Sequence, residues 1–245
     1  MKNPPKSRFY LLTSAVFLHL FSIICSVYRD TYRWENGYRD INYWITFFSW
    51  WCAQASLITI IYFIYRIFKS HSAGYFAKVF DLIVIQVNLI SIGFFTISAL
   101  AGLLPLPKSS EIISLFGWKV SSRAFWWFYA LIWHYLAPFL TLVYFVCRKT
   151  DLGKTYLARR KLFFCSFLHP LGYFILVLLR PFIPGSEIYP FSKELPNYPY
   201  FFFNWAGIKS IGHFFWTVTI ILFWLFIFWL SILLFGKLAG HKIRK

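Results

Sequence analysis

The stretch AFWWFYALIWHYLAPFLTLVYFVC, residues 124–147, decides the class of fold. It is apolar from end to end, and a helix of about 20 such residues spans the hydrocarbon core of a bilayer. His134 lies near its middle, and Pro138 follows one turn later. An ionisable side chain at that depth faces protein or water more often than lipid, and a proline tends to bend the helix. We therefore ask which residues the rest of the chain can place beside His134.

Apolar runs of similar length recur along the chain. Of its 245 residues, 59% are hydrophobic and 13% are charged, whereas about a quarter of the residues in soluble domains are charged. The runs are continuous, unlike the short alternating segments of a membrane β-barrel. We therefore predict an all-α, polytopic membrane protein with one domain, residues 1–245, built as a bundle of six transmembrane helices. The expected spans are residues 9–28, 43–68, 79–104, 124–147, 161–183 and 208–235.

The distribution of charge predicts the orientation in the membrane. Lys and Arg are concentrated in both terminal tails and in the loops around residues 66–78 and 148–161, whereas most acidic residues lie in the other three loops. Because cytoplasmic loops are rich in Lys and Arg, we place both termini in the cytoplasm, most simply at the plasma membrane. A net charge of +17 would suggest nucleic acid in a soluble protein. In short loops it indicates contact with anionic lipid headgroups, so membrane lipid and no nucleic acid is the expected partner.

The last extracytoplasmic loop, residues 184–207, is rich in Tyr, Phe and Pro. Loops of this length are usually functional or disordered, and the aromatic content of this loop argues against disorder. We therefore expect it to fold over the outer end of the bundle as a lid.

Small and polar residues inside the spans mark the faces where helices pack in a membrane. His134 and Thr141 lie on one stripe of small residues in the fourth span. Thr46 and Ser49 share a face of the second span, in the outer half of the membrane with His134. Each has a structural alternative, because an intramembrane Thr usually bonds its own backbone and a lone His can bond a neighbouring helix.

Other polar residues have simpler explanations. His169 precedes Pro170 and is expected to bond a carbonyl that this proline frees. Arg180, at the end of the fifth span, is expected to extend to the outer interface. His19 lies near the middle of the membrane and shares a face with Ser22. The four cysteines lack the spacing of a zinc or redox motif, and we expect no metal and no cofactor.

Three motifs occur in order along the chain: YWITFFSWWCAQ in the second span, WHYLAP in the fourth, and NYPYFFFNWAGIKSIG before the last. In order and spacing they resemble the androgen-induced-protein-like family of six-span membrane proteins and its bacterial relatives. That family pairs an aromatic-Thr-x-x-Ser/Asn motif with a His-x-x-x-Pro motif, and its bacterial branch adds a Tyr-Pro-Tyr-rich loop. The residues that match are Thr46 with Ser49, His134 with Pro138, and Tyr198 to Tyr200. Trp50 stands where the bacterial pattern has Asn.

The resemblance implies an intramembrane hydrolase that cleaves an ester bond of a lipid or fatty acyl substrate. It assigns the nucleophile to Thr46 and the base to His134. A threonine hydroxyl needs a neighbouring base, and a third group usually orients that base. The candidates for the orienting group are Tyr200, Asn204, His213 and a backbone carbonyl. The candidates for donors to the oxyanion are Ser49, the indole N–H of Trp50, and Asn204.

Two other functions fit the same composition. Six spans with scattered His, Asn and Arg also suit a small-solute transporter, although no matching helix interruptions mark the two halves. The basic cytoplasmic surface around residues 148–161 would suit a non-catalytic membrane accessory subunit. Solute uptake into vesicles would favour the transporter, and a stable partner in a mild-detergent pull-down would favour the accessory subunit.

Overall fold

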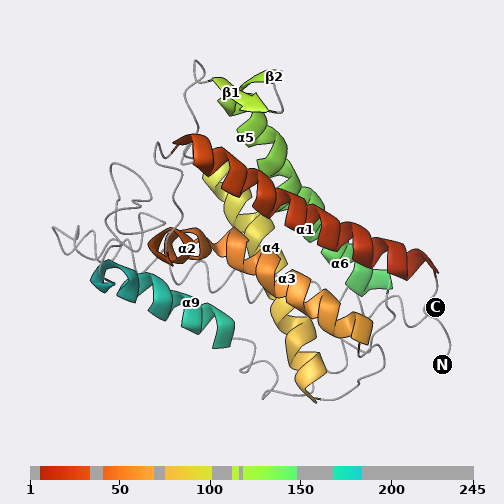
Figure 1. Ribbon diagram of the computed structural model, residues 1–245. Helices are drawn as coiled ribbons and strands as arrows, with labels where there is room; N and C mark the ends of the chain where they lie inside the picture. The colour runs from red at the N-terminus through yellow and green to blue at the C-terminus, as the bar shows by residue number, and fades with distance from the viewer. Residues whose placement is uncertain are drawn as a thin grey trace. The chain divides into compact units, whose positions relative to one another are not determined.

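The computed structural model describes residues 6–33, 41–68, 75–100, 112–115, 118–147 and 168–183, and these residues are mostly helical (Figure 1). Several predictions fall outside these segments. They are the sixth span, the lid loop at residues 184–207, and the candidate residues Tyr200, Asn204 and His213.

Four helices in the described segments are long and apolar enough to cross a membrane. They are α1 (Lys6–Arg33), α3 (Trp51–Phe68), α4 (Tyr75–Leu100), and a continuous rod formed by α5 (Ser122–Leu131), the π-helix η1 (Ile132–Leu136) and α6 (Ala137–Cys147). A shorter apolar helix, α9 (Leu168–Leu179), continues into the 3₁₀ turn η2 (Arg180–Phe182). These helices indicate a membrane protein by their length and composition.

The second expected span is divided into α2 (Ile41–Phe48) and α3, with a turn at Ser49 and Trp50. The Ser49 hydroxyl donates to the Ile45 carbonyl at 2.6 Å, and the Gln54 side-chain amide donates to the Phe48 carbonyl at 2.7 Å. The last carbonyls of a helix have no partner within the helix. The Gln54 side chain therefore stabilises the interruption by bonding the Phe48 carbonyl, whereas the Ile45 carbonyl also accepts from the backbone N–H of Ser49 at 3.0 Å.

A short antiparallel hairpin precedes α5 and departs from the all-α prediction. Strand β1 (Ile112–Leu115) pairs with β2 (Trp118–Ser121). Ile113 is buried while its neighbours on either side are exposed, which is the alternation of a strand with one covered face. The hydroxyl of Tyr28 on α1 donates to the Ser114 carbonyl at 2.8 Å, and this bond attaches the hairpin to α1.

The chain divides into two compact units. Unit 1 consists of Met1–Tyr38, Ala55–Ser72 and Val87–Arg148, and unit 2 of Arg39–Gln54, Ala73–Gln86 and Lys149–Lys245.

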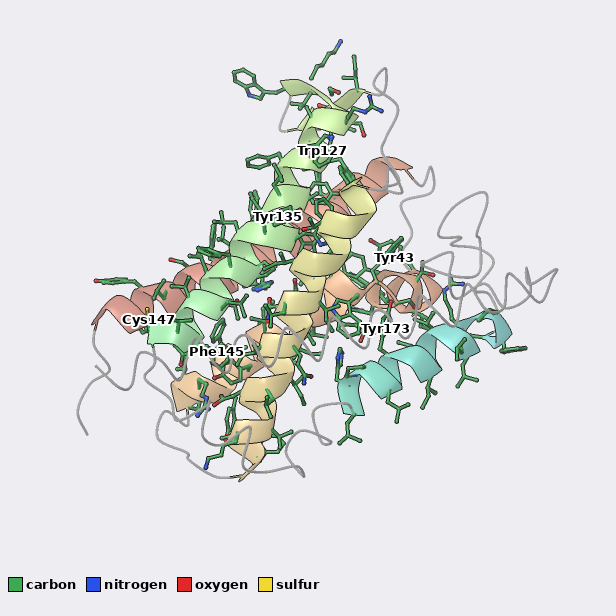
Figure 2. All side chains as sticks on the ribbon, turned by 180° about the vertical axis from the view of Figure 1, so that it is seen from behind. Tyr43, Trp127, Tyr135, Phe145, Cys147 and Tyr173 are labelled. Atoms are coloured by element: carbon green, nitrogen blue, oxygen red, sulfur yellow. The ribbon has the colours of Figure 1, made fainter. Side chains whose placement is uncertain are left out.

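In unit 1, α1 packs along α6, η1 and α5 (Figure 1). Helix α3 packs on α6 through buried aromatic rings, because Tyr62 lies 5.5 Å from Phe145 and Phe63 lies 5.3 Å from Tyr144 between ring centroids. Figure 2 labels Phe145 on α6, together with Tyr135 on η1. Aromatic pairs of this kind combine a large buried apolar area with a preferred geometry. They hold together α3 and α6, which carry the buried polar residues Ser56 and Thr141.

Candidate functional site

Thr46 lies in α2, and its side chain is buried. Its hydroxyl oxygen accepts a hydrogen bond of 2.5 Å from Nη2 of Arg180. The prediction that Arg180 extends to the interface was wrong, because its side chain is 0% exposed. A guanidinium inside a protein needs acceptors there, and the Thr46 oxygen is one of them.

Two further contacts attach α9 to the same part of unit 2. The hydroxyl of Tyr173 donates to the Ser49 carbonyl at 2.9 Å, and Nε2 of His169 lies 3.2 Å from Oε1 of Gln54. The ring of Trp51 packs edge-on against both Tyr173 and His169, and Figure 2 labels Tyr173 on α9. His169 thus bonds a side-chain amide, whereas a freed backbone carbonyl was predicted.

The order of these contacts defines the direction of α9. Residues 169, 173 and 180 of α9 and η2 contact residues 54, 49 and 46 respectively. Helix α9 therefore runs antiparallel to the segment from α2 to the start of α3. These contacts between α9 and the segment from α2 to α3 position Arg180 at Thr46.

His134 lies in η1, within unit 1. Its Nδ1 is 3.4 Å from the hydroxyl oxygen of Ser91 on α4, and its ring stacks on Phe95 with centroids 4.2 Å apart and planes 10° apart. On the next residue, the Tyr135 hydroxyl lies 2.9 Å from Thr96 Oγ1, which donates its own hydrogen to a carbonyl of α4. Tyr135 is therefore the donor. These contacts fix the orientation of the His134 ring against α4.

The π-helix around His134 follows from Pro138. A proline has no N–H, and in an α-helix its ring would collide with the carbonyl four residues earlier, which here belongs to His134. The backbone avoids this arrangement, because the N–H of Ala137 donates to the carbonyl of Ile132, five residues back. The bend that the sequence predicts at Pro138 therefore takes the form of a π-turn just before it. Single π-turns within α-helices are frequent at functional sites.

Thr46 belongs to unit 2 and His134 to unit 1. The contacts described above join Thr46 to Arg180, and His134 to Ser91 and Phe95. The pairing of Thr46 with His134 therefore stays a prediction. Among the supporting candidates, Ser49 donates its hydrogen to its own helix and Trp50 lies in the turn that follows.

The structure also contains a hydroxyl–imidazole pair that the sequence did not predict, centred on His19 of α1. Its Nδ1 lies 2.9 Å from Oγ of Ser56 on α3, and its Nε2 lies 3.3 Å from Oγ1 of Thr141 on α6. Nε1 of Trp133 in η1 donates to Ser56 Oγ at 2.6 Å. These four buried residues, which we call the His19 cluster, join α1, α3 and the α5–α6 rod.

The direction of each hydrogen bond in the His19 cluster follows from its donors. Thr141 Oγ1 donates to the Ala137 carbonyl at 2.9 Å, so it accepts from Nε2–H of His19. Nδ1 of the neutral ring is then an acceptor and receives the hydrogen of Ser56. Ser56 and His19 have the separation of a nucleophile and its base. However, His19, Ser56 and Thr141 are each no more than 1% exposed and bond one another across three helices, and we interpret the cluster as a structural link between helices.

Comparisons of the chain with family models, with curated proteins and with solved structures find no match. In the described segments there is no group of three or more His, Cys, Asp or Glu side chains that could hold a metal ion. The resemblance to a family thus rests on the three sequence motifs, and its implications are taken up as proposals.

Proposed function

We propose that this chain is an intramembrane hydrolase that cleaves an ester bond of a lipid or fatty acyl substrate, with Thr46 as nucleophile and His134 as base. The observation that carries the proposal is the hydrogen bond from Arg180 to the Thr46 oxygen. A guanidinium only donates, so this oxygen has a positive charge beside it. Negative charge that develops at or next to the oxygen during acyl transfer is stabilised by such a group.

The donor that contacts Thr46 is charged, whereas the donors that contact Ser56 and Thr59 are neutral. Ser56 accepts from the indole N–H of Trp133, and Thr59 accepts from the side-chain amide of Asn88. The Thr46 oxygen accepts from the guanidinium of Arg180 on another helix. Hydrogen bonds from charged donors are stronger than those from neutral donors, and this supports a chemical role for Thr46.

The setting of His134 supports its role as the base. A catalytic imidazole must keep a fixed ring orientation, and a third group usually provides it. Stacking on Phe95 and the contact of Nδ1 with Ser91 hold the ring in one plane. Ser91 is thus a candidate for the orienting group, in addition to the four candidates taken from the sequence.

The reaction proceeds in two acyl transfers. His134 accepts the hydroxyl proton of Thr46 while Thr46 Oγ1 bonds to the ester carbonyl carbon and the carbonyl electron pair moves onto oxygen. The tetrahedral intermediate collapses, the C–O bond to the alcohol breaks, and the imidazolium protonates the leaving alkoxide. Water then attacks the acyl-threonine with His134 again as base, which releases the fatty acid and restores Thr46.

Ester hydrolysis by the purified protein in liposomes tests the proposal. With a p-nitrophenyl ester of a long-chain fatty acid as substrate, we expect Thr46→Ala and His134→Ala each to lower kcat/KM by about 10²–10⁴-fold, because each removes a group that takes part in proton transfer or attack. Thr13→Ala is the matched control, since the Thr13 hydroxyl bonds only its own helix among the contacts described here, and it should leave turnover unchanged. Wild-type turnover by a folded Thr46→Ala protein contradicts the proposal.

A further inference from the structure

Arg180 is the largest fully buried side chain in the described segments. Arginine is almost never fully buried unless it is paired, and moving its charge out of water costs several kcal/mol. A buried ionisable group in a membrane protein therefore marks a functional site by default.

Arg66 is the other buried arginine in the described segments. Its Nε donates to the hydroxyl of Tyr62 at 3.1 Å, and its guanidinium lies over the rings of Tyr62 and Tyr65 at 5.3 and 5.8 Å. Arg180 reaches from η2 to a hydroxyl of α2, and this is the hydroxyl that the sequence motif assigns to the nucleophile.

The geometry places Arg180 where the reaction creates negative charge. When Thr46 Oγ1 bonds to an ester carbonyl carbon, the new oxyanion is separated from Oγ1 by only two bonds. A guanidinium carries five N–H donors in a planar fork, so one that contacts Oγ1 at 2.5 Å can also donate to the neighbouring oxyanion. Ser49, one of the sequence-based candidates for this task, donates its hydrogen to the Ile45 carbonyl.

We infer that Arg180 is a catalytic residue that stabilises the oxyanion formed when Thr46 attacks the ester, an inference that rests on the proposed function. During attack the carbonyl electron pair moves onto oxygen beside the guanidinium, and it returns to the C–O bond when the alcohol leaves. The proton moves only between Thr46, His134 and the leaving group. Arg180 stays protonated throughout and supplies charge and hydrogen bonds.

The test compares Arg180→Met and Arg180→Lys with the wild type in ester hydrolysis. Removal of one oxyanion donor lowers kcat by about 10²–10³-fold, so we expect a fall of that size for Arg180→Met with little change in KM. Arg180→Lys keeps the charge without the fork and should retain part of the activity. Tyr173→Phe is the matched control, because it removes the neighbouring bond from α9 to Ser49 and leaves Thr46 and Arg180 intact.

The outcomes separate this inference from the proposed function. If the wild type hydrolyses the ester through Thr46 and both folded Arg180 variants keep the wild-type kcat, the role of Arg180 is overturned and the proposed function stands. If the wild type shows no Thr46-dependent hydrolysis, the proposed function fails first. A loss in Tyr173→Phe equal to that in Arg180→Met shows that docking of α9 alone explains the effect and overturns the inference. If Arg180→Met does not fold, the comparison is between Arg180→Lys and Tyr173→Phe. A lower kcat in Arg180→Lys than in Tyr173→Phe supports the role of Arg180, and equal values overturn it.

Discussion

Ser22 and Ser56 are both buried serines, but their hydroxyl groups make different contacts. The Ser22 hydroxyl donates to the Leu18 carbonyl of its own helix. Ser56 belongs to the His19 cluster, where its oxygen accepts from Trp133 and its hydrogen goes to His19. Loss of the Ser56 hydroxyl would remove hydrogen bonds to two buried polar groups on other helices, whereas loss of the Ser22 hydroxyl removes only a bond within α1.

We therefore expect Ser56→Ala to lower the free energy of unfolding by about 1–3 kcal/mol, since it removes the hydrogen bonds from Trp133 and to His19 inside the protein. Ser22→Ala should change it little, because it deletes one hydrogen bond within one helix. Reversible unfolding of the purified protein in mixed micelles measures both variants. Equal stabilities for the two would show that the His19 cluster does not stabilise the packing of α1, α3 and the α5–α6 rod.

The sequence identifies which residues are costly in a membrane, and not which of them meet. His134 stood out because an ionisable side chain is costly inside an apolar span, and Thr46 stood out because it matches a family motif. Ser56 did not, although Ala55, Ser56 and Thr59 on α3 are the small residues typical of close helix contacts. Whether His19 reaches Ser56 depends on the rotation of α1 and α3 about their axes, which hydropathy does not determine. The same holds for Arg180, whose direction depends on where α9 ends.

Among the helices that the structure describes, the α5–α6 rod and the segment from α2 to α3 depart from regular α-helical geometry, and the sequence predicts only the first departure. Pro138 is a visible signal, and the π-turn of η1 lies directly before it. The turn at Ser49 and Trp50 has no Gly or Pro, so a continuous apolar run predicted one helix over 43–68. The Gln54 side chain, which bonds the end of α2, stabilises this turn, and such a bond is not encoded in a local pattern.

Substitution of Gln54 tests how much the turn at Ser49 and Trp50 contributes to the stability of the protein. Its amide donates to the Phe48 carbonyl and its oxygen lies 3.2 Å from Nε2 of His169, so it links α2, α3 and α9. We expect Gln54→Met, which has a similar length, to lower the free energy of unfolding by about 1–2 kcal/mol. Ile61→Met, at an exposed position of α3, is the control. Unfolding curves that coincide for the two variants would contradict this role of Gln54.

At the scale of the whole molecule, composition predicts the fold class and the membrane environment of the chain. The low charged fraction and the long apolar runs predicted a helical membrane protein, and the helical class is confirmed for the described segments, with four helices of spanning length. The number of six spans, the cytoplasmic position of both termini and the contact of the basic loops with anionic lipid stay predictions. The small hairpin of β1 and β2 was not predicted from the sequence, because its strands are only four residues each.

The most direct test of the central claim is the rate and position of covalent labelling by a fluorophosphonate bearing an alkyl chain. In the described segments, Thr46 contacts the guanidinium of Arg180, and Ser56 contacts the imidazole of His19, so the position of the label distinguishes these two hydroxyl groups. We predict that peptide mapping finds the phosphonyl group on Thr46. His134→Gln should lower the labelling rate by about 10²–10⁴-fold, as expected for loss of a general base. Label on Ser56, or label on Thr46 at the wild-type rate in His134→Gln, would contradict the assignment of Thr46 and His134 as nucleophile and base.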